Sequence, residues 1–103
     1  MSDHYILEGK KAVNTDLMTW AKWYETAERH VAQKIGKNGV RVSTVFLGLN
    51  HQWGNGPPQL FETMIFGGEH DQYQERCETW EQAEAMHKTA CDLAFGQDNE
   101  EAK

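Results

Sequence analysis

The strongest constraint on the fold is a pair of short apolar runs separated by a polar loop. The first run, VRVSTVFLGL, covers residues 40–49 and is rich in β-branched and aromatic residues, a composition that favours a strand over a helix. The second run, LFETMIF, covers residues 60–66. Residues 50–59 between them contain two glycines and two prolines, so we predict two antiparallel strands joined by this loop.

Two other segments have the pattern of extended chain. QYQERCET, residues 72–79, alternates Tyr73, Glu75, Cys77 and Thr79 with polar neighbours and predicts a third strand of the same meander. HYIL, followed by EGKKAV, indicates a short strand, a glycine turn and a second extended piece. We expect these two pieces to pair as a small hairpin at the edge of the fold.

Two helices are predicted. Asn14, Thr15 and Asp16 provide capping side chains before DLMTWAKWYETAERHVAQKIG, and Gly36 ends that segment. Apolar residues recur along it at helical spacing, namely Leu17, Trp20, Ala21, Tyr24, Ala27, Val31 and Ile35. The second helix starts at a capping box formed by Thr79 and Gln82.

These elements predict an α+β fold, a small antiparallel meander of about three to four strands with two helices packed on one face, in the order β-α-β-β-β-α. We expect a single domain over residues 1–95 and a mobile acidic tail over residues 96–103. The uncovered sheet face would carry some of the large apolar side chains of the central strands, so we expect a homo-oligomer. The candidates are Phe46, Phe61, Met64 and Phe66.

Charge and composition exclude several classes of function. The net charge is −6 and the pI is about 5.3, which argues against binding to a nucleic-acid backbone. There is no basic leader before an apolar run and no stretch of eighteen apolar residues, so we expect no membrane association and a cytoplasmic protein. Cys77 and Cys91 fall in no paired motif and are expected to be reduced.

Motifs for catalysis, metals and cofactors are missing. The five histidines contain no His-x-x-x-His pair, so we predict no metal site. There is no Gly-x-Ser-x-Gly elbow for a nucleophile and no glycine-rich phosphate loop, and the glycines of WGNGPP are followed by prolines instead of a helix. We therefore predict no cofactor and lean against an enzyme.

The loop at residues 50–59 is the predicted site, because long ordered loops in small domains often carry function. Asn55-Gly56 and Pro57-Pro58 should hold it in a preferred shape. Its aromatic, amide and imidazole groups are suited to stacking a planar ring and reading its edge. The predicted ligand-binding residues are Arg41, Asn50, His51, Trp53, Asn55 and Glu62. Alternatively, Trp53 folds back on the core and the loop is only a rigid turn.

Several segments together carry a family resemblance. YILEGKKAV, TWAKWYETAERHVA and RVSTVFLGLNHQWGNGPPQLFETMIFGG, followed by TWEQAEAMHK, resemble a family of small, functionally uncharacterised proteins encoded in phage and prophage genomes. The resemblance covers nearly the whole chain. The family has no settled activity, so the resemblance implies a setting in the host cytoplasm and no catalytic residue.

Three functional classes follow. The first is a non-enzymatic phage accessory protein that counteracts host defence by sequestering a small nucleotide signal or by blocking a host protein. The second is a small enzyme that uses His51 and Glu62 as an acid-base pair on a small molecule. The third is a structural or assembly protein of the phage. The binding class predicts that Trp53→Ala leaves folding intact and abolishes capture of the ligand or partner.

Overall fold

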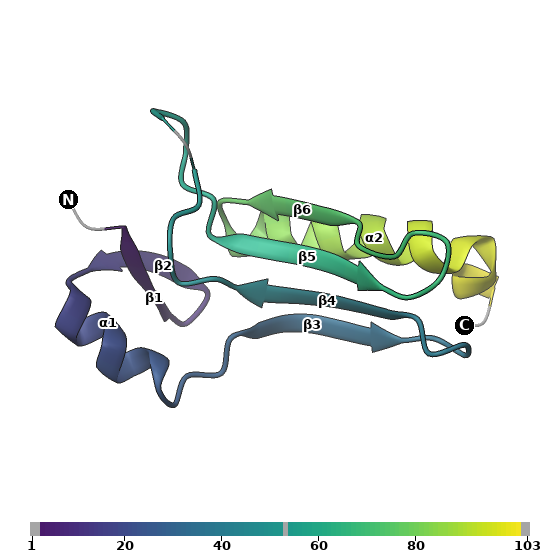
Figure 1. The fold of residues 1–103 in the computed structure, drawn as a ribbon, viewed down its shortest axis with the longest axis horizontal. Helices are drawn as coiled ribbons and strands as arrows, with labels where there is room; N and C mark the ends of the chain where they lie inside the picture. Colours follow the sequence, from purple (N-terminus) through teal and green to yellow (C-terminus); the bar gives the residue numbers. More distant parts are fainter. Residues whose placement is uncertain (1–2, 53, 102–103) are drawn as a thin grey trace.

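The computed structural model describes the backbone of residues 3–52 and 54–101, and the side chains of these residues up to Gly96. Within that part of the chain, two helices and two antiparallel sheets form an α+β fold (Figure 1), which confirms the predicted class. The elements in chain order are β1 His4–Glu8, β2 Lys11–Thr15, α1 Leu17–Tyr24, β3 His30–Ile35, β4 Arg41–Phe46, β5 Phe61–Phe66, β6 Gln74–Cys77 and α2 Trp80–Glu101.

The larger sheet is a four-stranded meander in the order β3-β4-β5-β6. Arg41 pairs with Phe66 and Phe46 pairs with Phe61, so β4 and β5 are in register over their whole length. This confirms the predicted pairing across the polar loop, and β6 confirms the predicted third strand of the meander. α2 lies along one face of this sheet and contacts all four of its strands (Figure 1).

Alternation along the strands decides which side chains meet α2. The residues that face this helix are fully buried: Val42, Thr44, Phe46, Phe61, Thr63 and Ile65. Phe46 and Phe61 therefore belong to the core and not to an uncovered face. Met64 and Phe66 lie on the opposite face, where both are half-buried.

The aromatic end of the core joins the two sheets. Phe46, Leu60, Phe61 and Ala83 form one buried cluster. Side chains of the N-terminal hairpin and of both helices pack against it, including Tyr5, Leu7, Ala12, Trp23 and Trp80. Each large side chain buried in this way stabilises the fold by about 1.5–3 kcal/mol. The hairpin is therefore part of the same folded unit as the meander.

The helix predicted from residue 16 to residue 36 is wrong in its second half. α1 begins as predicted, because the Asp16 carboxylate accepts a hydrogen bond from the backbone N–H of Thr19 at 2.8 Å. The helix ends at Tyr24, and residues His30–Ile35 form β3. A spacing of four residues fits one face of a strand as well as one face of a helix, and pairing with β4 decides between the two.

The predicted N-terminal hairpin is confirmed. β1 and β2 pair antiparallel from His4↔Thr15 to Glu8↔Lys11. Gly9 supplies the positive φ of 64° that the two-residue turn requires. α1 packs against β1 and reaches the larger sheet through Trp23, whose ring meets Phe46 edge-on at 5.8 Å.

α2 is interrupted near the predicted start of the tail. Gly96 has φ 62° and ψ −155°, which is not a helical conformation. The tail predicted for residues 96–103 thus starts at this interruption, and its mobility stays a prediction.

Candidate functional site

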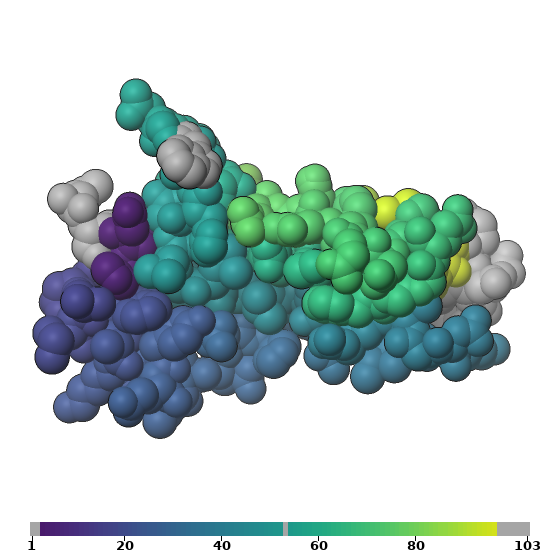
Figure 2. All heavy atoms as spheres, viewed as in Figure 1, coloured from purple at the N-terminus to yellow at the C-terminus, as the bar shows by residue number. Residues whose placement is uncertain are grey.

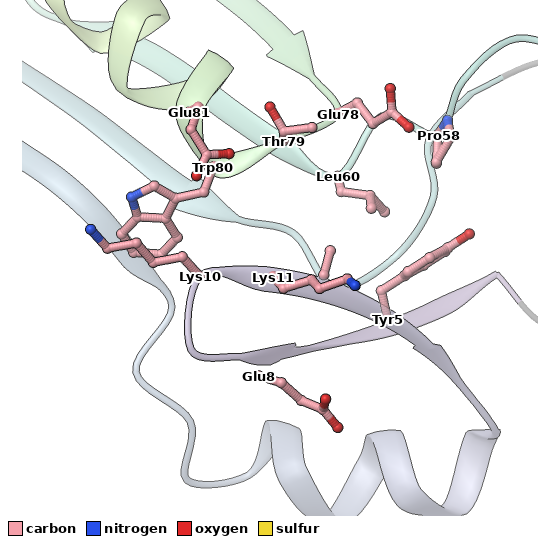
Figure 3. Close-up of a pocket in the computed structure, with 11 residues that line it drawn as sticks. Tyr5, Glu8, Lys10, Lys11, Pro58, Leu60, Glu78, Thr79, Trp80 and Glu81 are labelled. Atoms are coloured by element: carbon pink, nitrogen blue, oxygen red, sulfur yellow. The ribbon is translucent and has the colours of Figure 1, made fainter.

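An open cleft of about 540 Å³ lies where the N-terminal hairpin meets the start of α2 (Figure 3). Its volume falls in the range of sites for small ligands. Three parts of the chain supply the lining: the hairpin, the exit of the β4–β5 connection and the turn from β6 into α2. The lining residues are Tyr5, Glu8, Lys10, Lys11, Ala12, Pro58, Leu60, Glu78, Thr79, Trp80 and Glu81.

Backbone hydrogen bonds fix the hairpin wall of the cleft. The Tyr5 N–H donates to the carbonyl of Gly48 at 2.9 Å, and the Asn50 N–H donates to the carbonyl of Asp3 at 2.9 Å. β1 is therefore tied to the chain just after β4. The turn at Gly9 then brings Lys10 and Lys11 to the edge of the cleft (Figure 3).

The predicted capping box fixes the opposite wall. The backbone N–H of Gln82 donates to the Thr79 hydroxyl at 3.1 Å, while the Gln82 side-chain oxygen accepts from the N–H groups of Thr79 and Glu78 at 3.1 and 3.0 Å. These bonds confirm the predicted helix start. They also use amide groups that would otherwise attract an anion to the helix N-terminus.

Aromatic and apolar side chains form the base of the cleft. Trp80 packs edge-on against Phe61 with ring centroids 6.2 Å apart, and Leu60 beside it is 2% exposed. The Lys10 ammonium lies over the Trp80 ring, 5.8 Å from its centroid, within reach of a cation–π attraction. The Trp80 indole nitrogen is buried and has no hydrogen-bond partner within the described chain.

The two walls of the cleft carry opposite charge. Lys10, Lys11 and Glu8 belong to the hairpin, whose net charge at the cleft is positive, and Glu78 and Glu81 belong to the start of α2 and the turn before it. The Glu8 side chain points away from Glu78 and Glu81 (Figure 3). Among the described residues, no ion pair within 4.0 Å joins the two walls, because the three ion pairs found there lie elsewhere. The cleft therefore presents unpaired cations and unpaired carboxylates to a ligand at the same time.

The predicted binding loop projects from the body of the protein (Figures 1 and 2), and Pro58 near its end lines the cleft. The Asn50 side-chain oxygen accepts hydrogen bonds from the N–H groups of Gln52 and Gln59 at 2.9 and 3.0 Å, so Asn50 ties the two ends of the loop together. His51 and Asn55 are exposed. Trp53 lies outside the described residues, so its role as an aromatic platform stays a prediction.

The other two predicted site residues lie on the sheet. Arg41 stacks over the Phe66 ring at 4.3 Å. It lies at the end of β4 farthest from the loop, and the length of β4 from Arg41 to Phe46 is about 16 Å at the usual rise of a strand. The Glu62 carboxylate accepts from the Arg76 Nε at 3.0 Å and from the Gln74 amide at 2.6 Å. The structure thus brings Asn50, His51 and Asn55 together in one loop and leaves Arg41 apart from them.

A chain of buried polar side chains runs between the sheet and α2. The Thr44 hydroxyl lies 2.5 Å from the Thr63 hydroxyl and 2.7 Å from the His87 Nδ1, and the His87 Nε2 lies 3.5 Å from the Cys91 sulfur. Burial, together with the charge of Lys34, lowers the pKa of His87. We therefore assign a neutral imidazole, in which one of the two ring nitrogens donates and the other accepts.

The cysteines are poor nucleophiles in this setting. Burial raises the pKa of Cys91, and it raises the pKa of Cys77 to about 11. A thiol with a raised pKa is protonated at neutral pH and reacts slowly. No group of three or more His, Cys, Asp or Glu side chains is placed to hold a metal ion in residues 3–52 and 54–96.

Sequence reasoning recognised the elements around the cleft without recognising the cleft. The sequence predicts a glycine turn in EGKKAV and a helix start at Thr79, and neither signal indicates that the two segments lie together. Lys10, Lys11 and Trp80 come from positions about seventy residues apart in the chain. The opposite charge of the two segments is the one sequence feature that points to the cleft, and it acquires meaning only once the fold places the segments opposite each other.

Comparison of the chain with protein-family models, with curated protein sequences and with solved structures found no match. Neither of the helices in the described chain combines the length and the apolar character needed to cross a membrane.

Proposed function

We propose that this chain is a non-enzymatic phage accessory protein that acts by binding, and that it counteracts host defence by blocking a host protein. The observation that carries the proposal is the open cleft of about 540 Å³, with an aromatic base and unpaired charges of both signs. The phage setting rests on the resemblance of the quoted segments. The projecting loop beside the cleft would enlarge the contact surface.

The charges of the cleft favour a protein partner over a nucleotide signal. Three carboxylates line it against two ammonium groups, so a ligand with several phosphates would meet repulsion as well as attraction. The capping box occupies the N–H groups of Glu78, Thr79 and Gln82, which leaves fewer amides at the start of α2 for a phosphate. Arg41, a cation expected to assist nucleotide binding, lies at the far end of β4.

The same lining favours binding over catalysis. Among the described residues that line the cleft there is neither a histidine nor a cysteine, the side chains that most often act as base or nucleophile. The Thr79 hydroxyl is engaged in the helix cap. The enzyme alternative requires Glu62 to act with His51 as an acid-base pair. The Glu62 carboxylate instead accepts hydrogen bonds from Arg76 and Gln74, and these bonds compete with that role.

The test compares capture of host proteins by three forms of the tagged protein. Lys11→Glu changes the charge of the hairpin wall, and Lys22→Glu makes the same change at an exposed position of α1 away from the cleft. We expect a partner that wild type and Lys22→Glu retain and Lys11→Glu loses, with equal circular dichroism spectra for all three. Equal capture by the two variants contradicts the proposal.

Two additional measurements separate the alternatives. Native mass spectrometry of the protein purified from phage-infected cells would reveal a bound small molecule of nucleotide mass. Such a molecule would favour sequestration of a nucleotide signal over the blocking of a host protein. Loss of capture in Trp53→Ala, with capture retained in Lys11→Glu, would place the contact on the projecting loop instead of in the cleft.

A further inference from the structure

We propose that the cleft binds an extended peptide segment of the partner in which an acidic and a basic side chain flank an apolar one. This inference rests on the proposed function, because it names the part of a partner protein that the cleft would hold. The acidic side chain would lie against Lys10 and Lys11, the basic one against Glu78 and Glu81, and the apolar one against Trp80.

The separation of charge between the walls is the first argument. The hairpin wall carries Lys10 and Lys11 together with Glu8, which points away from the α2 wall, while the wall at the start of α2 carries Glu78 and Glu81 (Figure 3). No ion pair within 4.0 Å connects these two walls in the described chain, so the charges of both walls are available to a ligand. A ligand with both charges would pair with each wall, whereas a ligand with one charge meets repulsion from the other wall.

The base of the cleft is the second argument. Tyr5, Leu60 and Trp80 offer aromatic and aliphatic surface between the charged walls. Lys10 rests on the Trp80 ring at 5.8 Å from its centroid. The lysine stem is flexible and its ammonium is solvated, so Lys10 can leave the ring for an incoming carboxylate and expose the indole to the apolar side chain of the ligand.

The size of the cleft is the third argument. A volume of about 540 Å³ suits a drug-sized ligand, which is the scale of a few consecutive amino acids. Because the cleft is open to the molecular surface, a bound peptide can continue beyond it. A partner would present a surface loop or an extended terminus to this cleft.

The test uses three blocked tripeptides that differ only in charge: acetyl-Lys-Leu-Glu-amide, acetyl-Lys-Leu-Lys-amide and acetyl-Glu-Leu-Glu-amide. Each is titrated into ¹⁵N-labelled full-length protein, and chemical-shift changes of the backbone amides and of the Trp80 indole N–H are followed. We expect the mixed peptide to bind most tightly, with shifts at Lys11, Glu78 and Trp80. Preference for either single-charge peptide, or no shift at these three residues with any peptide, overturns the inference.

Matched variants check which wall binds which charge. A single exposed ion pair changes affinity by roughly two- to five-fold, so Glu78→Gln should weaken binding of the mixed peptide by that factor and should not weaken binding of the Glu-Leu-Glu peptide. Lys11→Gln should weaken the mixed peptide similarly and spare the Lys-Leu-Lys peptide. Lys22→Gln is the control and should change neither. The opposite assignment of charges to the walls would contradict the proposed orientation.

Failure of this inference is distinguishable from failure of the proposed function. If a host partner is lost in Lys11→Glu but the mixed peptide does not bind preferentially, the cleft contacts the partner by another chemistry. If neither the partner nor any peptide depends on the cleft, both proposals are wrong.

Discussion

The buried polar chain between the sheet and α2 makes a prediction about two threonines that look equivalent in sequence. Thr44 and Thr63 face each other on paired strands and are both fully buried. Thr44 is the central member, because its hydroxyl contacts both Thr63 and the His87 Nδ1. Replacement of either threonine by valine keeps the shape of the side chain and removes the hydroxyl.

The two substitutions leave different groups without partners. Thr44→Val leaves the Thr63 hydroxyl and the His87 nitrogen without a hydrogen-bond partner. Each buried polar group without a partner costs about 1–3 kcal/mol. We expect Thr44→Val to lower the free energy of unfolding by about 2–4 kcal/mol. Thr63→Val leaves Thr44 bonded to His87 and removes one hydrogen bond, which costs about 1 kcal/mol.

Urea unfolding at pH 7.5, followed by tryptophan fluorescence, measures this difference. With a slope of about 1.5 kcal/mol per M for a domain of this size, the midpoint should fall by about 1.3–2.7 M in Thr44→Val and by about 0.7 M in Thr63→Val. The slope itself should stay constant, which shows that the extent of unfolding is unchanged. A loss in Thr63→Val equal to or larger than that in Thr44→Val would refute the central position of Thr44 in this hydrogen-bond chain.

Three other predictions follow from local contacts. Because burial lowers the pKa of His87, the unfolded chain takes up a proton more readily than the folded protein. The free energy of unfolding should therefore fall as the pH drops below 6.5, the ordinary pKa of histidine, and urea midpoints at several pH values should show a weaker decline in His87→Gln. Gly48 and Gly54 share a φ of 79°, but a Cβ at Gly48 would lie 3.1 Å from Trp20. Substitution by alanine should lower the free energy of unfolding by about 1 kcal/mol at Gly54 and by about 1–3 kcal/mol more at Gly48, as measured by chemical denaturation. Asn50→Ala should lower the melting temperature by roughly 5–10 °C, whereas Asn50→Asp, which retains the oxygen acceptor, should lower it less; differential scanning fluorimetry compares the two.

Local chemistry predicted the elements that depend on local signals. The apolar runs before and after residues 50–59 became β4 and β5, and the Thr79–Gln82 capping box became the start of α2. These features are set by side-chain alternation and by hydrogen bonds between residues close in sequence. The hairpin at Gly9 is of the same kind.

The sequence prediction is wrong where contacts between residues distant in sequence decide the secondary structure. Residues 30–35 carry apolar side chains at a spacing that suits a helix, and only the pairing with β4 makes them a strand. A register shift between His30 and Ala32 also turns Val31 toward the core, so the simple alternation that would have marked the strand is broken. No pattern within one segment contains this information.

The candidate site was predictable only in part, for the same reason. Residues 50–59 form a projecting connection whose ends are joined by Asn50, and this much follows from loop length and turn residues. Arg41 was grouped with the loop on the strength of its charge, but position along β4 separates them. The cleft depends on two walls from opposite ends of the chain, and a single sequence does not reveal their meeting.

The tie between β1 and the end of β4 has a consequence for local opening. Pairing within the hairpin and within the meander joins neighbours in the chain, whereas the bonds from Tyr5 to Gly48 and from Asn50 to Asp3 join residues more than forty positions apart. Such contacts form late, after the local pairings. Transient release of the hairpin would remove one wall of the cleft while the meander and α2 stay folded. The affinity of the cleft for a ligand therefore includes the free energy of hairpin docking, and a bound ligand that spans both walls would slow the exchange of the Tyr5 and Asn50 amide protons.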